Sequence, residues 1–285
     1  MKENVISSNE DILIEMALLE DLDGVGDVTS SAVFSDETDE FYLISKSEGV
    51  LCGRRLFEKV MAKVDPSVNV SFHFSDGDAL KKGDCVADVS GKVLSILQGE
   101  RTAINFLSHL SAVATKTARL VKVAEGKVRI LDTRKTLPGY RLLQKYAVKC
   151  GGGENHRIGL FDMVLIKDNH QDAAGGLSAA VEKVRAKWGD RYAVEVEVRN
   201  ADEVKEALAC RVDRIMFDNM SDDEMKAAAA LVGGSCETEA SGNMNLDRLA
   251  SVRETGVDFV SFGELTHSVE AFDFSLRKNR GESKQ

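Results

Sequence analysis

The sequence is poor in the features that build linkers, membrane spans and nucleic-acid surfaces. Proline occurs twice in 285 residues, which argues against long proline-rich linkers. No apolar run approaches the roughly 20 residues of a membrane span, and residues 1–16 hold no apolar core of signal-peptide length. Positive charge is also scarce, because 37 Lys and Arg face 47 Asp and Glu, for a formal net charge of −10. This balance disfavours nucleic acid and membrane surfaces as main partners, and we expect a cytoplasmic protein.

Cysteine pairs at metal-binding or redox spacing are absent from the sequence. The chain has five cysteines: Cys52, Cys85, Cys150, Cys210 and Cys236. They form no CxxC motif, so we expect reduced thiols rather than a disulfide framework or a zinc site. Cys150, beside three glycines, is open to two interpretations, a nucleophile or a small buried side chain. We favour packing, because no His or acid lies at an informative sequence spacing.

Positive charge is concentrated in one stretch, residues 134–170. The stretch carries seven Lys and Arg and two His against three acids, whereas the rest of the chain has 30 Lys and Arg against 44 Asp and Glu. The stretch contains the glycine-rich sequence Gly151–Gly153. An acidic chain that gathers cations around a glycine turn predicts a pocket for a small, multiply anionic ligand.

The pattern of apolar residues divides the chain. Residues 10–22 and 95–123 have helical periodicity, and residues 41–49, 68–74 and 85–97 are typical of β strands. From about residue 128, short apolar runs alternate with helical segments. This β/α alternation predicts a parallel sheet, either closed as a barrel or doubly wound.

Most of the predicted strands in this second part end in charged or hydroxyl residues. Barrel enzymes place their chemistry at the C-terminal ends of their strands. In the run VEVEV the period of two puts the valines on one face and Glu195 and Glu197 on the other. If helices cover the valines, the glutamates point into the barrel mouth. A solvated antiparallel edge strand shows the same alternation, and this alternative stays open.

The strand ends supply one positive and one negative set of side chains. The positive set is Arg134, Lys135, His156, Arg157 and Lys167, and the negative set is Glu197 and Asp218. Guanidinium and ammonium groups bind carboxylates and phosphates, whereas paired carboxylates bind Mg²⁺ or stabilise a cationic sugar centre. A structural ion-pair network is the alternative, and the clustering at strand ends makes it less favoured. The Gly151–Gly153 turn is no P-loop, and it either lets backbone approach a ligand or ends a helix.

Several motifs carry a resemblance that runs nearly end to end. They are EDLDGVGDVTS, GERTAINFL, DTRKTLPGYRLLQKYAVKCGGGENHRIGL, VLIKDNH, EVEV, FDNMS, EASGN and GELTHS. With them the chain resembles the quinolinate phosphoribosyltransferases, the decarboxylating nicotinate-nucleotide pyrophosphorylases of NAD biosynthesis. The resemblance implies an open, incomplete TIM-like α/β barrel over residues 106–270. It also implies a smaller N-terminal α/β sandwich domain over residues 1–105 with the tail 271–285, and a homodimer whose active sites are completed by the partner subunit.

The resemblance also implies roles for individual residues. Catalysis is expected from Glu197, Asp218, Lys135 and Lys167. Substrate binding is expected from Arg101, Thr133, Arg134, Lys135, His156, Arg157, Lys167, Glu197, Asp218, Ser241, Gly242, Asn243, Ser261, Gly263 and His267. Arg101 corresponds to an arginine that reaches quinolinate from the neighbouring subunit, and Glu197 with Asp218 corresponds to the pair that binds Mg²⁺, through water. Asn243 stands in the phosphate loop where many members have glycine, which leaves its role there open.

The activity implied is that of a type II phosphoribosyltransferase. It converts quinolinate and phosphoribosyl pyrophosphate into nicotinate mononucleotide, CO₂ and pyrophosphate. Three alternatives remain: a ModD-like paralogue with another substrate, a Schiff-base lyase on a barrel that uses Lys135 or Lys167, and a non-catalytic anion-binding protein. The intact NHR and IKDNH motifs favour the quinolinate enzyme, and the retained acidic pair disfavours the anion-binding protein.

Overall fold

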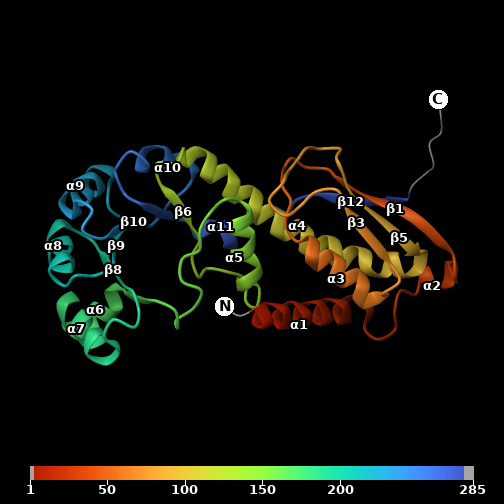
Figure 1. Ribbon diagram of the computed structural model, residues 1–285, viewed down its shortest axis with the longest axis horizontal. Helices are drawn as coiled ribbons and strands as arrows, with labels where there is room; N and C mark the ends of the chain where they lie inside the picture. Colours follow the sequence, from red (N-terminus) through yellow and green to blue (C-terminus); the bar gives the residue numbers. More distant parts are fainter. Residues whose placement is uncertain (1–2, 279–285) are drawn as a thin grey trace. The chain divides into compact units, whose positions relative to one another are not determined.

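The computed structural model describes residues 3–278, with side chains from Asn9 onward (Figure 1). Contacts divide the described residues into two compact units. The first takes the chain up to Ala118, Pro138–Gly152 and the residues from Ser268, and the second takes Arg119–Leu137 and Gly153–His267. Domain boundaries after residues 105 and 270 stay a prediction; in the structure residue 105 lies inside a helix, and residues 279–285 of the expected tail lie outside the described residues.

The first unit is built on an antiparallel sheet whose strand order is β12-β1-β5-β3. Its strands are β1 (Thr38–Ser45), β3 (Asn69–Phe72), β5 (Cys85–Lys92) and β12 (Phe274–Lys278), and β2 (Gly49–Val50) pairs with β4 (Ala79–Leu80). Its helices are α1 (Glu3–Leu22), α2 (Ser30–Val33), α3 (Arg54–Val64), α5 (Arg141–Cys150) and most of α4 (Val93–Ala124). The buried face of α3 packs on this sheet through Phe57, whose ring meets Phe72 of β3 edge-on.

The prediction of a β strand over residues 85–97 is wrong in its second half. The strand ends at Lys92, and Val93 already begins α4. The break falls after Gly91, whose φ of 150° is costly for a side-chain-bearing residue and whose Cα faces the backbone of Val68. Short apolar runs do not distinguish a buried strand from a buried helix start.

The second unit confirms the predicted β/α alternation. Its strands are β6 (Arg129–Leu131), β7 (Val164–Ile166), β8 (Val194–Val198), β9 (Arg214–Asp218), β10 (Glu237–Ser241) and β11 (Phe259–Ser261). They pair in parallel in the order β6-β11-β10-β9-β8-β7. Within the described residues β6 and β7 end this order, so the barrel is open rather than closed.

Helices alternate with these strands and flank them on the outside (Figure 1). They are α6 (Asp168–Ala174), α7 (Leu177–Trp188), α8 (Ala201–Ala209), α9 (Asp222–Val232), α10 (Leu246–Val252) and α11 (Glu264–His267). Capping fixes where two of them start. The side chain of Asn200 accepts from two backbone N–H groups of α8, and Ser221 with Glu224 forms a capping box at α9. None of the helices in residues 3–278 is long and apolar enough to cross a membrane.

Burial along β8 settles the interpretation of VEVEV. All five of its residues are buried, and β8 lies between β7 and β9 in parallel register. The alternative of a solvated antiparallel edge strand is therefore wrong. The valines are fully buried on one face, and the two glutamates project on the other, toward the interior of the barrel.

Candidate active site

The carboxyl ends of the parallel strands meet at one end of the second unit. Ser241 is in register with Asp218, and Ser261 is in register with Leu131. Residues that follow these strands therefore gather around one opening, as the C-terminal ends of barrel strands do. The predicted strand-end chemistry comes together there.

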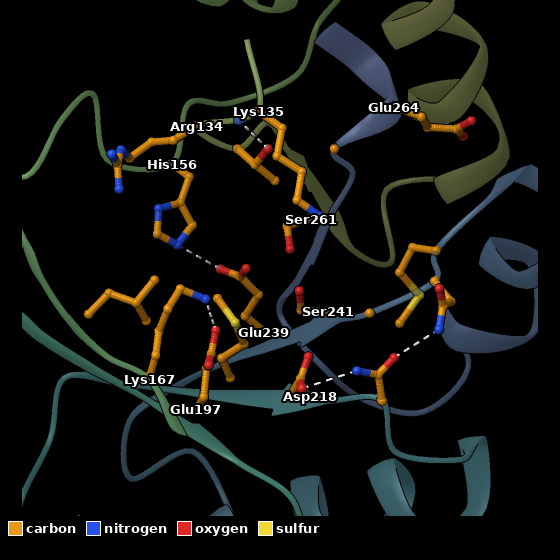
Figure 2. Close-up of a pocket in the computed structure, with 18 of the residues that line it drawn as sticks. Arg134, Lys135, His156, Lys167, Glu197, Asp218, Glu239, Ser241, Ser261 and Glu264 are labelled. Atoms are coloured by element: carbon orange, nitrogen blue, oxygen red, sulfur yellow. Dashed lines mark hydrogen bonds and ion pairs between the residues drawn. The ribbon is translucent and has the colours of Figure 1, made fainter. Parts of the chain in front are cut away.

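A cavity of about 520 Å³ lies at this end of the barrel (Figure 2). Of the residues predicted from the sequence, its lining includes Thr133, Arg134, Lys135, His156, Arg157, Lys167, Glu197, Asp218, Ser241, Gly242, Asn243, Ser261, Gly263 and His267. The lining also includes Leu165, Met216, Asn219, Glu239, Met244 and Glu264, which the sequence did not single out. Arg101 is solvent-exposed on α4 in the first unit, and the lining as described does not include it.

The Asn155–His156–Arg157 segment is held beside β6 by a buried carboxylate. Glu154 donates its N–H to the carbonyl of Ile130 and accepts from the N–H of Asp132, which forms a parallel bridge alongside β6. Asp132 is 0% exposed and accepts from the backbone N–H of His156 at 2.9 Å and from Asn155 Nδ2 at 2.7 Å. A hydrogen-bonded buried carboxylate fixes its donors tightly. Asp132 thus positions the residues that carry His156 and Arg157 into the cavity.

Cations on the cavity wall crowd one another. Burial lowers the pKa of the Arg157 guanidinium, and the neighbouring guanidinium of Arg134 lowers it further. Arg157 Nη1 also donates to the carbonyl of Met163 at 3.3 Å, which fixes its direction. Like charges held together repel unless an anion lies between them. This wall therefore suits a ligand that carries carboxylates or phosphates.

Lys167 and Glu197 form an ion pair at the ends of β7 and β8 (Figure 2). The Lys167 side chain is 45% exposed, whereas that of Glu197 is 11% exposed. The ammonium therefore stands at the mouth and the carboxylate lies deeper. A protonated, paired amine is a poor nucleophile, so this geometry disfavours Schiff-base chemistry at Lys167.

Asn243 takes part in a chain of side-chain amides that ends on Asp218. Asn243 Nδ2 donates to Asn219 Oδ1 at 3.0 Å, and Asn219 Nδ2 donates to Asp218 Oδ2 at 3.0 Å (Figure 2). Asn243 has a φ of 49°, a left-handed conformation that Asn tolerates better than most residues. A Cβ on Gly242 would lie 2.3 Å from Asn219 Oδ1, so only glycine fits there. The asparagine thus links the loop after β10 to the acidic pair.

The backbone of Lys135 is held by the hydroxyl groups of two threonines. Its N–H donates to Thr133 Oγ1 at 3.1 Å, and its carbonyl accepts from Thr266 Oγ1 at 2.8 Å. A Cβ on Gly263 would lie 2.8 Å from Cδ of Lys135 and 3.1 Å from Nε2 of His267. The absence of a side chain at Gly263 therefore makes room for the side chains of Lys135 and His267.

The floor of the cavity rests on a buried cluster whose mutual contacts the sequence did not predict, although it placed His156 and Glu195 at the barrel mouth. His156 Nε2 lies 2.9 Å from Glu195 Oε2 and 3.5 Å from Glu239 Oε2, and both glutamate side chains are 0% exposed. Burial raises the pKa of Glu195 to about 7 and that of Glu239 to about 8. Nδ1 of His156 accepts from the N–H of Arg157 at 2.7 Å, which places a ring proton on Nε2, toward the glutamates. Arg214 Nη1, 3.3 Å from Glu239 Oε2, adds positive charge.

At this end of the barrel, two groups of the described side chains are candidates for holding a cation. Glu197 and Asp218 offer carboxylate oxygens at neighbouring strand ends inside the cavity, which are the hard ligands that Mg²⁺ prefers. Ligand atoms of His156, Glu195 and Glu239 lie within 4.8 Å of one another. This second group includes an imidazole and two carboxyl groups whose pKa is raised by burial, so it suits Mg²⁺ poorly. The donor set of Glu197 and Asp218 fits the expected ion.

Comparison with known proteins covers nearly the whole chain. Residues 27–111 match the family described as "Quinolinate phosphoribosyl transferase, N-terminal domain", and residues 113–277 match its C-terminal domain. The chain belongs to the quinolinate phosphoribosyltransferase family. It is 40% identical over 265 residues to a probable nicotinate-nucleotide pyrophosphorylase (carboxylating) of Bacillus subtilis, covering 93% of this chain and 91% of that protein.

Other family members agree in sequence and in structure. A chloroplastic nicotinate-nucleotide pyrophosphorylase (carboxylating) of Arabidopsis thaliana is 43% identical over 289 residues, covering 93% of this chain and 81% of that protein. The structure of the nicotinate-nucleotide pyrophosphorylase from Francisella tularensis superposes with a TM-score of 0.92 at 39% identity, covering 95% of this chain and 96% of the other. Membership of the quinolinate phosphoribosyltransferase family thus extends over both parts of the fold.

Proposed function

We propose that this chain transfers the phosphoribosyl group of phosphoribosyl pyrophosphate to quinolinate and releases nicotinate mononucleotide, CO₂ and pyrophosphate. One observation carries the proposal: a cationic wall and a carboxylate pair face one another in a single cavity at the strand ends. Both substrates are polyanions, and the reacting sugar carbon becomes cationic. A site for this reaction therefore needs both signs of charge. Relatives of this chain at about 40% identity are named for this activity.

The cations have two tasks in this reaction. Arg134 and Arg157 orient the carboxylates of quinolinate, since their planar guanidinium groups match carboxylates. Lys135 and Lys167 offset the charge that develops on pyrophosphate as its bond to C1 of the ribose breaks. The loop Ser241–Asn243, with Ser261, Gly263 and His267, would hold the 5′-phosphate, and all of these residues line the cavity. Preorganised charge of this kind is commonly the largest catalytic contribution.

The acids act on the ribose. The ring nitrogen of quinolinate attacks C1 while pyrophosphate leaves, through an oxocarbenium-like transition state. Glu197 and Asp218 stabilise the positive charge that forms there. The nitrogen then bears a positive charge, so the pyridinium can hold the electron pair left at C2 when CO₂ departs. A proton from solvent then replaces the lost carboxylate, and the chain needs no residue dedicated to decarboxylation.

Magnesium belongs to this proposal as the expected cofactor. Glu197 and Asp218 would hold it, through water, and the ion would supply charge neutralisation for pyrophosphate. EDTA should abolish product formation and added Mg²⁺ should restore it. Full activity in EDTA would remove the metal from the proposal.

A direct assay tests the function. Purified protein is mixed with quinolinate, phosphoribosyl pyrophosphate and Mg²⁺, and nicotinate mononucleotide and CO₂ are measured together. We expect equal amounts of both products, and nicotinate in place of quinolinate should give little product. A strong preference for another pyridine or pyrimidine acid would instead favour a ModD-like paralogue. Borohydride trapping with carbonyl compounds should leave Lys135 and Lys167 unmodified, whereas a reducible adduct would support the lyase.

We further propose a homodimer in which Arg101 of each subunit enters the partner's cavity. Arg101 is solvent-exposed on α4, so its guanidinium is accessible to a partner. Arg101→Ala and Glu197→Ala should each be inactive, and mixing the two should restore activity at one site of each mixed dimer. Mixtures without activity would place Arg101 outside a shared site. A cytoplasmic location completes the proposal, because the five free cysteines are typical of a reducing compartment.

A further inference from the structure

Two cysteines that are far apart in the sequence meet in the first unit. Cys52 lies just before α3, and Cys150 is the last residue of α5. Their sulfur atoms and a carboxylate oxygen of Asp76 lie within 4.8 Å of one another. Cys52 is 0% exposed, whereas Cys150 is partly exposed. One thiol is therefore accessible to a small reagent, and the other is held beside it.

The backbone holds both thiols in place through α4. The N–H of Cys52 donates to Oγ of Ser111 at 2.9 Å, and the Ser111 hydroxyl donates back to the Cys52 carbonyl at 3.2 Å. Next to Cys150, a Cβ on Gly151 would lie 2.3 Å from the carbonyl oxygen of Ala114, so the chain packs directly on α4. Both cysteine-bearing segments are thus anchored to α4, and their sulfur atoms, within 4.8 Å of one another, have to approach to about 2 Å to form an S–S bond.

The surroundings favour thiol chemistry over metal binding. Asp76 is already engaged, since Oδ1 accepts from the N–H groups of Gly53 and Arg54, and Oδ2 accepts from the Tyr146 hydroxyl at 2.8 Å. A metal ion would have to compete with these donors for the carboxylate. The Cys52 thiol, which donates to Cys150, lowers the pKa of Cys150, although burial and Asp76 oppose this. A larger thiolate fraction makes a cysteine the more reactive nucleophile.

We propose that Cys150 and Cys52 form a peroxide-reactive dithiol site that closes reversibly to an intramolecular disulfide. The Cys150 thiolate attacks one oxygen of hydrogen peroxide, the O–O bond breaks, and the departing hydroxide takes up a proton to form water. The Cys52 sulfur then attacks the sulfenic acid sulfur of Cys150. The S–S bond forms as the S–O bond breaks, and the Cys52 proton goes to the departing hydroxide. Two thiols lose two electrons, and peroxide becomes two waters.

This site uses none of the residues that line the proposed active site and does not depend on the proposed activity. Its chemical role is to stop oxidation at a reversible stage. A sulfenic acid without a neighbouring thiol proceeds to sulfinic acid, which is irreversible for most proteins. Cys52 removes that intermediate, and a dithiol reductant restores both thiols.

The experiment treats the reduced full-length protein with a small excess of hydrogen peroxide near pH 7. We expect the intact mass to fall by two hydrogen atoms, a digest to contain a peptide pair joined through Cys52 and Cys150, and dithiothreitol to reverse both changes. Before oxidation, Cys150 should react with iodoacetamide faster than the exposed Cys85, because the hydrogen bond from the Cys52 thiol lowers the pKa of Cys150, whereas burial raises the pKa of Cys85. A digest in which peroxide leaves these two cysteines unlinked would overturn the proposal.

Variants separate the two roles. Cys52→Ser should stop at the sulfenic acid on Cys150, which a 1,3-diketone probe captures, and Cys150→Ser should leave Cys52 unreactive. Cys85→Ser is the matched control and should form the same linked peptide. Circular dichroism checks that each variant is folded, and Cys52→Ala serves if the serine is not. If the two thiols react only after a chelator is added, they hold a metal ion, and the dithiol assignment is wrong.

Discussion

Replacing Asp132 by asparagine would test how the Asn155–His156 segment is positioned. The carboxylate is fully buried and accepts from Asn155 Nδ2 and from the N–H of His156. An amide of the same size offers one oxygen, so in either orientation its NH₂ group faces one of the two donors. Losing a buried hydrogen bond to a charged acceptor costs about 1.5–3 kcal/mol, and the unpaired donor adds to this. We expect Asp132→Asn to lower the free energy of unfolding by about 2–4 kcal/mol.

The measurement is urea denaturation followed by the fluorescence of Trp188, the only tryptophan of the chain, which ends α7 in the second unit. The kcat/KM for product formation should fall by about tenfold or more, because small displacements of binding groups lower the reaction rate strongly. The double variant Asp132→Asn, Asn155→Asp exchanges the two side chains, so one donor again faces one acceptor. It should recover at least about 1 kcal/mol of the lost free energy of unfolding.

Asp190→Asn is the matched control, since Asp190 is 98% exposed and its ion pair with Arg185 should contribute less than about 1 kcal/mol. If Asp132→Asn is as stable and as active as this control, the buried carboxylate does not position the segment.

Three further substitutions give separate readouts. Glu197→Gln keeps the size of the side chain but removes its charge. In steady-state kinetics, kcat should fall by about 10²-fold or more with little change in the KM for quinolinate. An unchanged kcat would exclude Glu197 from the mechanism. Burial raises the pKa of Glu239 from 4.5 to about 8. The preference of the folded state for the protonated side chain therefore contributes stability that is fully present below pH 4.5 and is lost as pH rises through about 8. Glu239→Gln mimics the protonated acid, so its free energy of unfolding should rise relative to that of the parent as pH rises from about 6 to about 9. Urea denaturation at each pH measures this difference, and a difference that does not change with pH would contradict the prediction. Asn243→Gly removes the hydrogen bond to Asn219. The free energy of unfolding in urea should fall by about 0.5–1.5 kcal/mol, and the KM for phosphoribosyl pyrophosphate should rise. An unchanged stability and KM would show that the amide chain is dispensable.

The residues at the strand ends could be predicted because two simple regularities coincide there. Short apolar runs mark the strands, and parallel strands bring their carboxyl ends together. Glu197 and Asp218 follow from this reasoning directly, and the structure places both in the cavity. The same regularities say nothing of loop conformation, so the link from Asn243 through Asn219 to Asp218 could not be expected from the sequence.

The contacts of the buried floor could not be found in the same way, although the alternation in VEVEV directed Glu195 toward the barrel mouth. Glu195 and Glu239 precede the strand ends by two or more positions and resemble the polar face of an ordinary exposed strand. Their burial depends on Arg214 and His156, which come from a neighbouring strand and from the segment before β7. Local sequence does not show which charges will meet in a barrel interior. An acidic residue at an inward position of a parallel strand is nevertheless a usable signal, since such strands are usually covered on both faces.

The pairing of β12 with β1 has a consequence for the order of synthesis. Phe41 to Ser45 are in register with Lys278 to Phe274, so the edge of the N-terminal sheet is covered by residues made more than 200 positions later. A ribosome releases β1 long before its partner strand exists. The first unit therefore cannot complete its hydrogen-bonded sheet until the residues of the second unit have been synthesised, although domains usually fold in the order of synthesis. Until β12 arrives, β1 presents an unpaired edge, which is the part of a nascent chain most in need of protection from aggregation.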